Sequence, residues 1–281
     1  MAANTDRVLV GLTIERYKEI EPAVILGLVR LLGLEFVEIT KTVFEDVDRI
    51  AAKLDGMRCG FHLPIVCEDG WDLSTPAAQD EIDNLIDLIN TNRQRLHVSH
   101  VICHPPEDDG HPSTDPRREE VLLDNLSRLE VPVFLENVPH LTESDYLALY
   151  SRARERLGEQ LLGMCYDGPH YFLTGADPVA ALERHLDEIG CVHLSDCTRD
   201  RDAHLPFGRA GALPIDAILQ TLKRRDYRGI INLEIRPENF QDVLPTIESY
   251  LSVLKLFRPG KYLSTRMRLW FVYPILKRVL A

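Results

Sequence analysis

The sequence predicts one α/β domain, a single (β/α)8 TIM barrel in which eight parallel strands alternate with helices. Short β-rich runs alternate with longer helical patterns eight times, which is typical of parallel strands joined by right-handed helical crossovers. The length of 281 residues suits one such barrel, since these domains run to roughly 250 residues. Neither a linker nor a shift in composition divides the alternating part of the chain.

Turn residues and helix caps bound the expected elements. Gly33, Gly190 and Gly229 lie where helices are expected to end, and Ser144 and Asp177 lie where helices are expected to begin. The expected strands, in order, are Val8–Leu12, Glu35–Ile39, Arg58–Leu63, Ser99–Cys103, Val131–Leu135, Gly163–Tyr166, Gly190–Leu194 and Ile230–Ile235. The expected helices are Ala23–Leu32, Glu45–Leu54, Pro76–Leu96, Arg117–Leu129, Glu143–Leu157, Pro178–Ile189, Pro214–Arg225 and Phe240–Leu256.

The last part of the chain differs in character from the barrel. We expect a barrel over residues 1–257 and a basic, aromatic extension over residues 258–281. The extension carries six Lys and Arg residues and no acid, so the rest of the chain holds a charge of −18 within the total of −12. A helix packed on the chain's own barrel is the favoured expectation for it. Contact with a second subunit as a homodimer, with an anionic ligand or with a membrane surface stays open.

Composition bounds the class of protein. The hydrophobic fraction of 45% and the charged fraction of 27% are ordinary for a folded domain and exclude disordered and collagen-like classes. The acidic balance disfavours nucleic acid as the partner over most of the surface, although a local cationic groove is compatible with it. Six cysteines without a CxxC pair indicate reduced thiols, and no run approaches the roughly 20 apolar residues of a membrane span. A soluble, cytoplasmic protein with a small-molecule substrate is therefore expected.

Ionisable side chains recur where the expected strands end, which is where barrel enzymes carry their chemistry. Six strand ends supply His62, His104, Glu136, Asp167, His193 and Glu234. Because side chains alternate along a strand, the residues two positions earlier should also face inward. These are Gly60, Ile102, Phe134, Cys165, Cys191 and Asn232, so both cysteines are expected in the core. Carboxylates crowded in one pocket repel each other, which predicts a divalent metal: Mn, Zn, Co or Mg.

Other polar residues are not assigned to the metal site. Lys41 is expected to be solvated, and Asn137 either orients Glu136, contacts substrate or serves the turn that follows. Five histidines have no matched role and are assigned to the surface or to helices: His97, His100, His111, His140 and His185.

The order of these motifs resembles the xylose isomerase-like TIM barrels. This superfamily contains sugar-phosphate isomerases and epimerases as well as AP endonucleases of the endonuclease IV type. The resemblance covers about residues 7–257 and does not include the extension. It is most specific in Met164–Asp177, where Asp167 and His170 form a DxxH pattern, and in residues 193–211, which hold HLSD and then DAHLPFGRAG.

The isomerase branch implies one divalent metal held by Glu136, Asp167, His193 and Glu234. Glu136 and Glu234 are then the acid and base that move a proton through an enediolate of a small sugar, sugar phosphate or cyclitol. His170 acts with them on the substrate. Asn137, Arg209 and Arg236 are the implied substrate-binding residues.

The endonuclease branch implies up to three zinc ions and a hydrolase, which cleaves an AP-site phosphodiester or a small-molecule ester or amide such as that of a corrinoid. Its implied metal ligands are His62, His104, Glu136, Asp167, His170, His193, Asp202, His204 and Glu234. The chain lacks the glycine-rich DNA-contact segment of that branch and has Val10–Thr13 in its place. The isomerase is the favoured hypothesis, the hydrolase is the alternative, and a binding barrel without chemistry is third.

Overall fold

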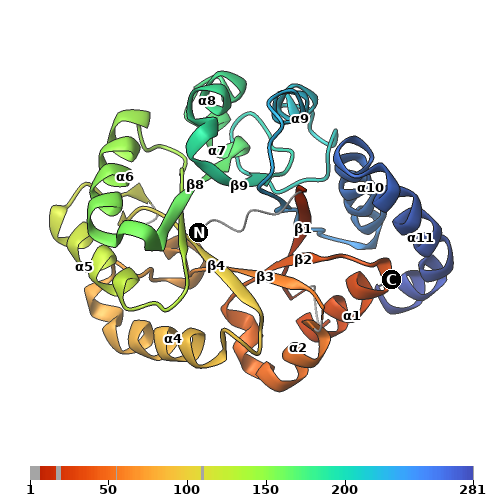
Figure 1. The fold of residues 1–281 in the computed structure, drawn as a ribbon, viewed down its shortest axis with the longest axis horizontal. Helices are drawn as coiled ribbons and strands as arrows, with labels where there is room; N and C mark the ends of the chain where they lie inside the picture. Colours follow the sequence, from red (N-terminus) through yellow and green to blue (C-terminus); the bar gives the residue numbers. More distant parts are fainter. Residues whose placement is uncertain (1–6, 17–19, 55, 109–110, 281) are drawn as a thin grey trace.

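A computed structural model describes residues 7–16, 20–54, 56–108 and 111–280 as a closed barrel of eight parallel strands (Figure 1). Around the barrel the strands follow the order β1-β10-β9-β8-β7-β4-β3-β2. Their bounds are β1 Leu9–Ile14, β2 Phe36–Ile39, β3 Arg58–His62, β4 Val98–Cys103, β7 Val133–Glu136, β8 Leu161–Asp167, β9 Ile189–Leu194 and β10 Ile230–Leu233. The predicted fold class is confirmed.

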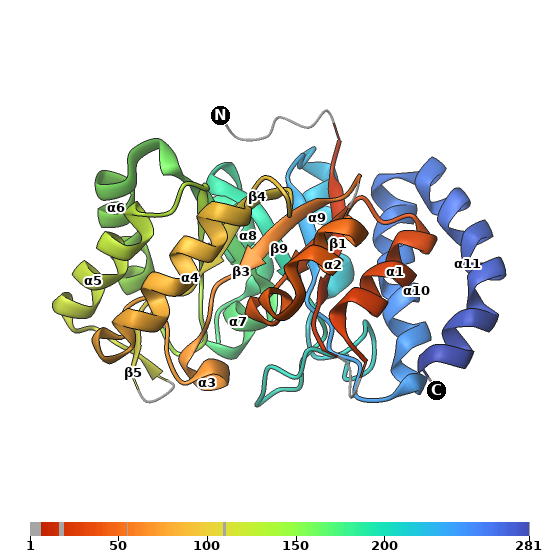
Figure 2. The ribbon, with the colours of Figure 1, turned by 90° about the horizontal axis from the view of Figure 1, so that it is seen from below.

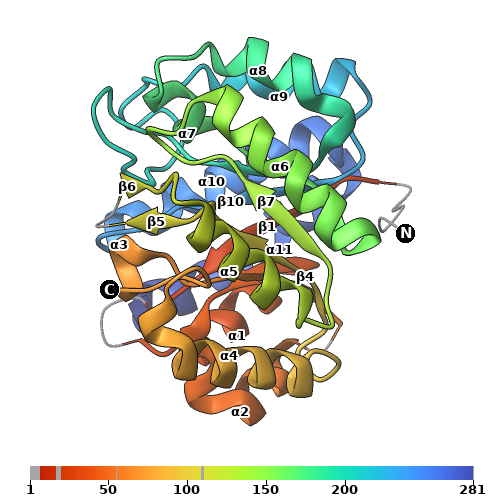
Figure 3. The same ribbon diagram turned by 90° about the vertical axis from the view of Figure 1, so that its left-hand side faces the viewer.

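Helices surround the barrel and run back along its outside (Figure 1). The main ones are α1 Pro22–Leu32, α2 Val47–Leu54, α4 Gln79–Asn92, α5 Pro116–Ser127, α6 Glu143–Leu157, α8 Pro178–His185, α9 Ile215–Arg224 and α10 Phe240–Phe257. Two short helices, α3 Val66–Asp69 and α7 Gly168–Leu173, follow β3 and β8 at the carboxyl ends of the strands. A small hairpin of β5 (Glu107–Asp108) and β6 (His111–Pro112) lies at the same end (Figures 2 and 3).

Two of the predicted boundaries are corrected. The side chain of Thr142, rather than Ser144, caps α6 by accepting a hydrogen bond from the backbone N–H of Asp145. Gly190 does not end a helix, because it is the second residue of β9. A Cβ atom there would lie 2.3 Å from the ring of Phe134, so the close approach of that ring requires glycine. Asp177 caps α8 as predicted.

The barrel interior alternates as predicted. Ile102, Phe134, Cys165 and Cys191 pack together below the carboxyl ends of the strands, and each is at most 5% exposed. The amide of Asn232 is fully buried and donates a hydrogen bond to the hydroxyl of Thr13 at 2.8 Å. A dry apolar layer therefore supports the polar residues above it.

The C-terminal extension forms one helix, α11 (Pro259–Leu280), which lies against α10 and α1 outside the barrel (Figures 1 and 2). Arg258 and Lys261 both bind the carboxylate of Glu35, which fixes the start of this helix. The favoured expectation of a helix packed on its own barrel is confirmed. None of the helices in the described ranges is long and apolar enough to cross a membrane.

Candidate metal centre

The nine predicted ligand residues gather in three adjacent groups at the carboxyl ends of the strands. In the first group, ligand atoms of His62, His104 and Glu136 all lie within 4.8 Å of one another. The second group meets the same criterion and consists of Glu136, Asp167, His193 and Glu234. In the third group, the Nε2 atoms of His170 and His204 lie 3.1 and 3.4 Å from Oδ2 of Asp202. Glu136 belongs to two groups and joins them.

Local backbone structure places the third group. Asp167 ends β8 and caps α7 by accepting a hydrogen bond at 2.6 Å from the backbone N–H of His170, so the DxxH spacing is the first turn of a helix. The loop after β9 brings Asp202 and His204 back over the barrel. His204 is held with φ of 45°, a conformation that costs free energy in a residue other than glycine and is typical of functional sites.

Each of the five clustered histidines uses one ring nitrogen to hold an acceptor outside the cluster. The Nδ1 atoms of His62, His170 and His204 donate to backbone carbonyls at 2.8, 2.7 and 3.1 Å. Nδ1 of His104 lies 3.4 Å from the carboxylate of Glu107, and Nε2 of His193 donates to Glu38 at 3.0 Å. These outer partners fix the tautomers and leave the other nitrogen of each ring for the cluster, as in histidines that bind metals.

Glu38 was missed by the sequence analysis. It lies in β2, is fully buried and bonds His193, which is 155 residues away in the chain. The only local signal was a single acid in the apolar strand Phe36–Ile39. Glu38 lies two positions after Phe36 in the strand, so both side chains point to the same side of it, into the barrel. The sequence therefore held a weak indication that Glu38 faces inward.

Several buried polar atoms inside the cluster have no hydrogen-bond partner. They are both carboxylate oxygens of Glu136, Nε2 of His104, Nδ1 of His193 and Oδ1 of Asp202. Leaving such an atom unpaired costs about 1–3 kcal/mol, and more where the group is charged. A divalent cation satisfies imidazole nitrogens and carboxylate oxygens together, and this donor set suits Zn, Mn or Co. The residues present therefore fit a metal centre.

The charges in the cluster shift one another's pKa values. Burial raises the pKa of Glu136, but the neighbouring imidazoles of His193 and His104 hold it well below its usual range. Burial lowers the pKa of His62, but the carboxylate of Glu136, 3.5 Å from its Nε2, outweighs this and raises the pKa to about 10. Burial raises the pKa of Asp167 well above its usual range, despite the nearby imidazole of His170. Without a cation, the cluster therefore retains protons at neutral pH.

The three predicted substrate-binding residues are placed differently from one another. Arg236 lies at the mouth between Glu15, at 3.2 Å, and Glu234, at 3.7 Å. The amide of Asn137 accepts from the backbone N–H of Asp167 and donates to its carbonyl, so it joins the ends of β7 and β8. Asn137 also lines a cavity of about 330 Å³ beside α6 and α7. Arg209 forms an ion pair with Asp242 at 2.6 Å and has no contact with the nine ligands among the described residues.

Two cavities meet at Arg236. A polar cavity of about 210 Å³ adjoins His62 and is lined by Lys41, Glu68 and Arg236. An apolar cavity of about 140 Å³ lies between α1, α10 and the end of α11. The side chain of Lys41 is 37% exposed, in line with the expected solvated lysine, and its ammonium also pairs with Asp69 at 2.6 Å and lies over the ring of Trp71.

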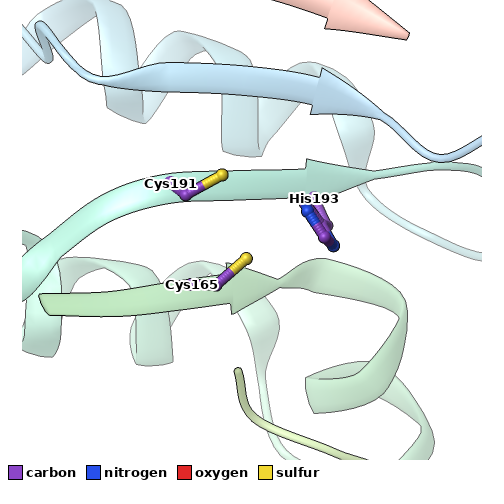
Figure 4. Close-up of side chains that lie close together, drawn as sticks. All are labelled: Cys165, Cys191 and His193. Carbon is purple, nitrogen blue, oxygen red and sulfur yellow. The ribbon is translucent and has the colours of Figure 1, made fainter. Parts of the chain in front are cut away.

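The layer under the metal centre holds two thiols. Cys165 and Cys191 are paired in register on β8 and β9, and their sulfur atoms lie beside the ring of His193 (Figure 4). Both are fully buried, as predicted for core residues. The assignment of His100 to the surface or a helix is wrong: its ring is 1% exposed in β4, where it is stacked on Phe36, and Gly60 leaves the space that it occupies.

The fold and the strand-end cluster define a class, a TIM barrel with candidate metal-binding groups at the carboxyl ends of its strands. Within that class, the chain belongs to the family described as xylose isomerase-like TIM barrel, which it matches over residues 26–258. A curated relative from Sinorhizobium fredii, the uncharacterized protein y4fM, is 33% identical over 105 residues. That match covers 37% of this chain and 33% of the relative.

Solved structures share the fold at low sequence identity. An AP endonuclease, family 2, from Brucella melitensis matches with a TM-score of 0.66 and 16% identity, over 89% of this chain and 98% of that one. A D-tagatose 3-epimerase-like protein matches with a TM-score of 0.63 and 18% identity, over 88% and 98%. The 3-keto-D-glucoside 4-epimerase YcjR from E. coli matches with a TM-score of 0.61 and 14% identity, over 89% and 100%. Sugar epimerases and family 2 AP endonucleases thus share this barrel.

Proposed function

We propose that this protein is a multinuclear, metal-dependent hydrolase that cleaves an ester of an anionic substrate, with a phosphate ester or phosphodiester as the favoured class. The observation that carries the proposal is the set of three adjacent ligand groups, in which five histidines are oriented from outside. A centre with one metal needs four of these residues. The remaining five are His62, His104, His170, Asp202 and His204, and their buried nitrogens and oxygens face the same cluster.

Charge connects the number of metals to the class of substrate. The cluster holds four carboxylates, those of Glu136, Asp167, Asp202 and Glu234. With neutral histidines these four carboxylates carry a charge of −4, and the carboxylates of Glu38 and Glu107, bonded to His193 and His104, add −2. Three divalent ions would balance this charge, whereas one ion would leave −4. Three ions would therefore permit an anionic ester to bind, and one ion suits an uncharged sugar.

The roles of the chain's own residues follow from their contacts. His62, His104 and Glu136 would hold one ion, Glu136, Asp167, His193 and Glu234 a second, and His170, Asp202 and His204 a third. When bound, ions in adjacent groups activate water and stabilise the negative charge on a leaving oxygen. Arg236 lines the polar cavity beside His62, and its guanidinium lies 3.7 Å from the carboxylate of Glu234. Burial raises the pKa of Glu234, but the imidazoles of His204 and His193 hold it well below its usual range.

A second candidate is an isomerase or epimerase with one metal, which acts on a small sugar, sugar phosphate or cyclitol. The observation in its favour is that Glu136 and Glu234 both lie 3.2 Å from Nδ1 of His193. Two carboxylates beside one metal position suit proton removal and return through an enediolate. In this candidate His170 would act on the substrate, and His62, His104, Asp202 and His204 have no role.

Metal content per chain tests the proposal. We expect three zinc ions per chain by elemental analysis of protein purified without chelator, together with hydrolysis of bis(p-nitrophenyl) phosphate. Asp202→Asn should lose one ion, whereas Asp200→Asn, an exposed acid in the same loop, should lose none. One ion per chain, with deuterium exchange into a ketose in heavy water and no ester hydrolysis, would replace the hydrolase with the isomerase.

A further inference from the structure

The C-terminal helix α11 exposes an uncovered apolar face to the outside. This outer stripe consists of Leu263, Met267, Trp270, Phe271, Pro274 and Ile275. Residues three or four positions apart share one side of a helix, so these side chains form one continuous row. The opposite side of α11 is buried and includes Thr265, Leu269, Val272 and Leu276. The helix therefore has two apolar sides, of which the barrel covers one.

The exposure is concentrated on this helix. Among the described residues, nine large hydrophobic side chains are exposed, and six of them lie on α11. Trp270 and Phe271 are 74% and 66% exposed, and their rings contact each other at a centroid distance of 4.8 Å. A clustered apolar patch of this kind marks an interaction site, whereas single exposed hydrophobics are ordinary.

Positive charge lies at the C-terminal end of the outer stripe. The helix α11 carries five Lys and Arg residues and no acid, on a protein whose other residues are strongly acidic. Lys277 and Arg278 are exposed and lie three and four positions after Pro274, on the same side as the stripe. Lys261 and Arg266 are tied to Glu35 and Glu248, so they anchor the helix to the barrel.

We propose that α11 docks the protein onto an anionic lipid surface, with the helix lying in the plane of the interface. An apolar face with aromatic residues, flanked by lysine and arginine, is the pattern of helices that bind in this way. Trp270 and Phe271 would enter the boundary between headgroups and acyl chains, while Lys277 and Arg278 meet anionic headgroups. This helix lies outside the matched part of the family, which ends at residue 258.

The arrangement leaves the metal centre accessible. The helix α11 lies on the flank of the barrel beside α10 and α1, not across the carboxyl ends of the strands (Figures 1 and 2). Docking through the outer stripe therefore places one flank of the barrel on the lipid and leaves its mouth open. The ion pairs of Glu35 and Glu248 would fix the barrel's orientation at the surface.

A second copy of the chain fits the outer stripe less well. A symmetric dimer through α11 would place Lys277 and Arg278 of one copy against either the same cations or the opposite end of the other copy's α11, since such a contact joins the same patch on both copies. The helix offers no acid to pair with them. An anionic lipid surface supplies the apolar layer and the negative charge together.

Vesicle binding of the full-length protein tests this proposal. We expect co-sedimentation with phosphatidylcholine vesicles that contain one quarter phosphatidylglycerol, and at least about tenfold weaker binding to vesicles of phosphatidylcholine alone. The double variant Trp270→Ser, Phe271→Ser should weaken binding by about tenfold or more, since both rings leave the interface. Arg278→Glu should weaken it by about tenfold, because one positive charge near the headgroups is replaced by a negative one.

Matched controls separate docking from general effects. Leu88→Ser removes an exposed leucine from α4, and Arg225→Glu reverses an exposed charge at the end of α9, so neither should change binding. Circular dichroism verifies that every variant is folded. Failure to bind anionic vesicles, or equal binding by the double variant, would overturn the proposal. So would a dimer in light scattering that the double variant dissociates, which would assign the outer stripe to a second copy.

Discussion

Replacing Glu38 by glutamine removes a charge from behind His193 while it preserves the shape of the side chain. Glu38 is fully buried, and its carboxylate accepts a hydrogen bond at 3.0 Å from Nε2 of His193. The other ring nitrogen, Nδ1, faces Glu136 and Glu234 at 3.2 Å. The carboxylate of Glu38 therefore fixes the tautomer of His193 and increases the basicity of Nδ1. We expect Glu38→Gln to weaken metal binding in the second ligand group.

The size of the effect follows from this one contact. A hydrogen bond to a charged group contributes about 1.5–3 kcal/mol, and a neutral acceptor retains roughly half of it. The variant therefore loses about 1 kcal/mol or more from this hydrogen bond. Removal of such an outer partner typically lowers metal affinity tenfold to hundredfold, which corresponds to about 1.4–2.7 kcal/mol. We therefore expect a decrease in zinc affinity of about tenfold in the variant.

Competition with a chromophoric chelator measures this affinity directly. Glu143→Gln is the matched control, because Glu143 forms the same type of pair with His185, at 2.6 Å, on the outer helices α6 and α8. The control should keep the affinity of the unchanged protein. If folded Glu38→Gln also keeps it within about twofold, then Glu38 does not support a metal ligand and the assignment of His193 as a ligand loses its basis.

Three further results are expected. The pKa of His62 in the metal-free protein is raised from 6.5 to about 10, so its ring is protonated between these pH values. Zinc added at neutral pH should therefore release protons, which a pH indicator detects. Zinc binding without proton release would contradict this prediction. Gly60→Ala should destabilise the fold by about 1–3 kcal/mol in urea, because its Cβ would lie 2.7 Å from Nε2 of His100. The control variant Gly260→Ala should leave the stability unchanged, because a Cβ atom at that position has open space around it. Removal of metal by a chelator should lower the melting temperature, because buried carboxylates then repel each other, and an unchanged melting curve would count against a metal centre.

The fold was predictable because strand and helix periodicity are local properties of the sequence. Six of the nine ligand candidates follow from a related argument, since parallel strands all end at the same edge of a barrel. The other three, His170, Asp202 and His204, were implied only by the family resemblance. His100 shows a signal that was present and misjudged: it has the same strand parity as Ile102 and His104, which predicts an inward position. The contact of Glu38 with His193 could be identified only from the three-dimensional structure, because nothing near Glu38 in the sequence indicates a partner in β9.

Contacts between distant segments also decide local details that the sequence left open or misplaced. Of the three roles considered for Asn137, substrate contact stays a prediction, and the structure adds hydrogen bonds between its amide and the backbone of Asp167 in the neighbouring strand. Gly190 has the residue type of a helix end, but the ring of Phe134 determines its place in β9. In each case, the deciding atom belongs to a strand that is adjacent in space and distant in sequence.

The shared carboxylate of Glu136 makes the first two ligand groups interdependent. Its Oε2 lies 3.5 Å from Nε2 of His62 in the first group and 3.2 Å from Nδ1 of His193 in the second, while Oε1 faces His104 at 3.6 Å. Loss of this charge would therefore weaken two metal positions at once, whereas loss of the charge on Asp202 would weaken one. A barrel that binds a single ion has no need of a carboxylate that joins two sets of histidines, and this connection is the strongest physical reason to expect more than one metal in the centre.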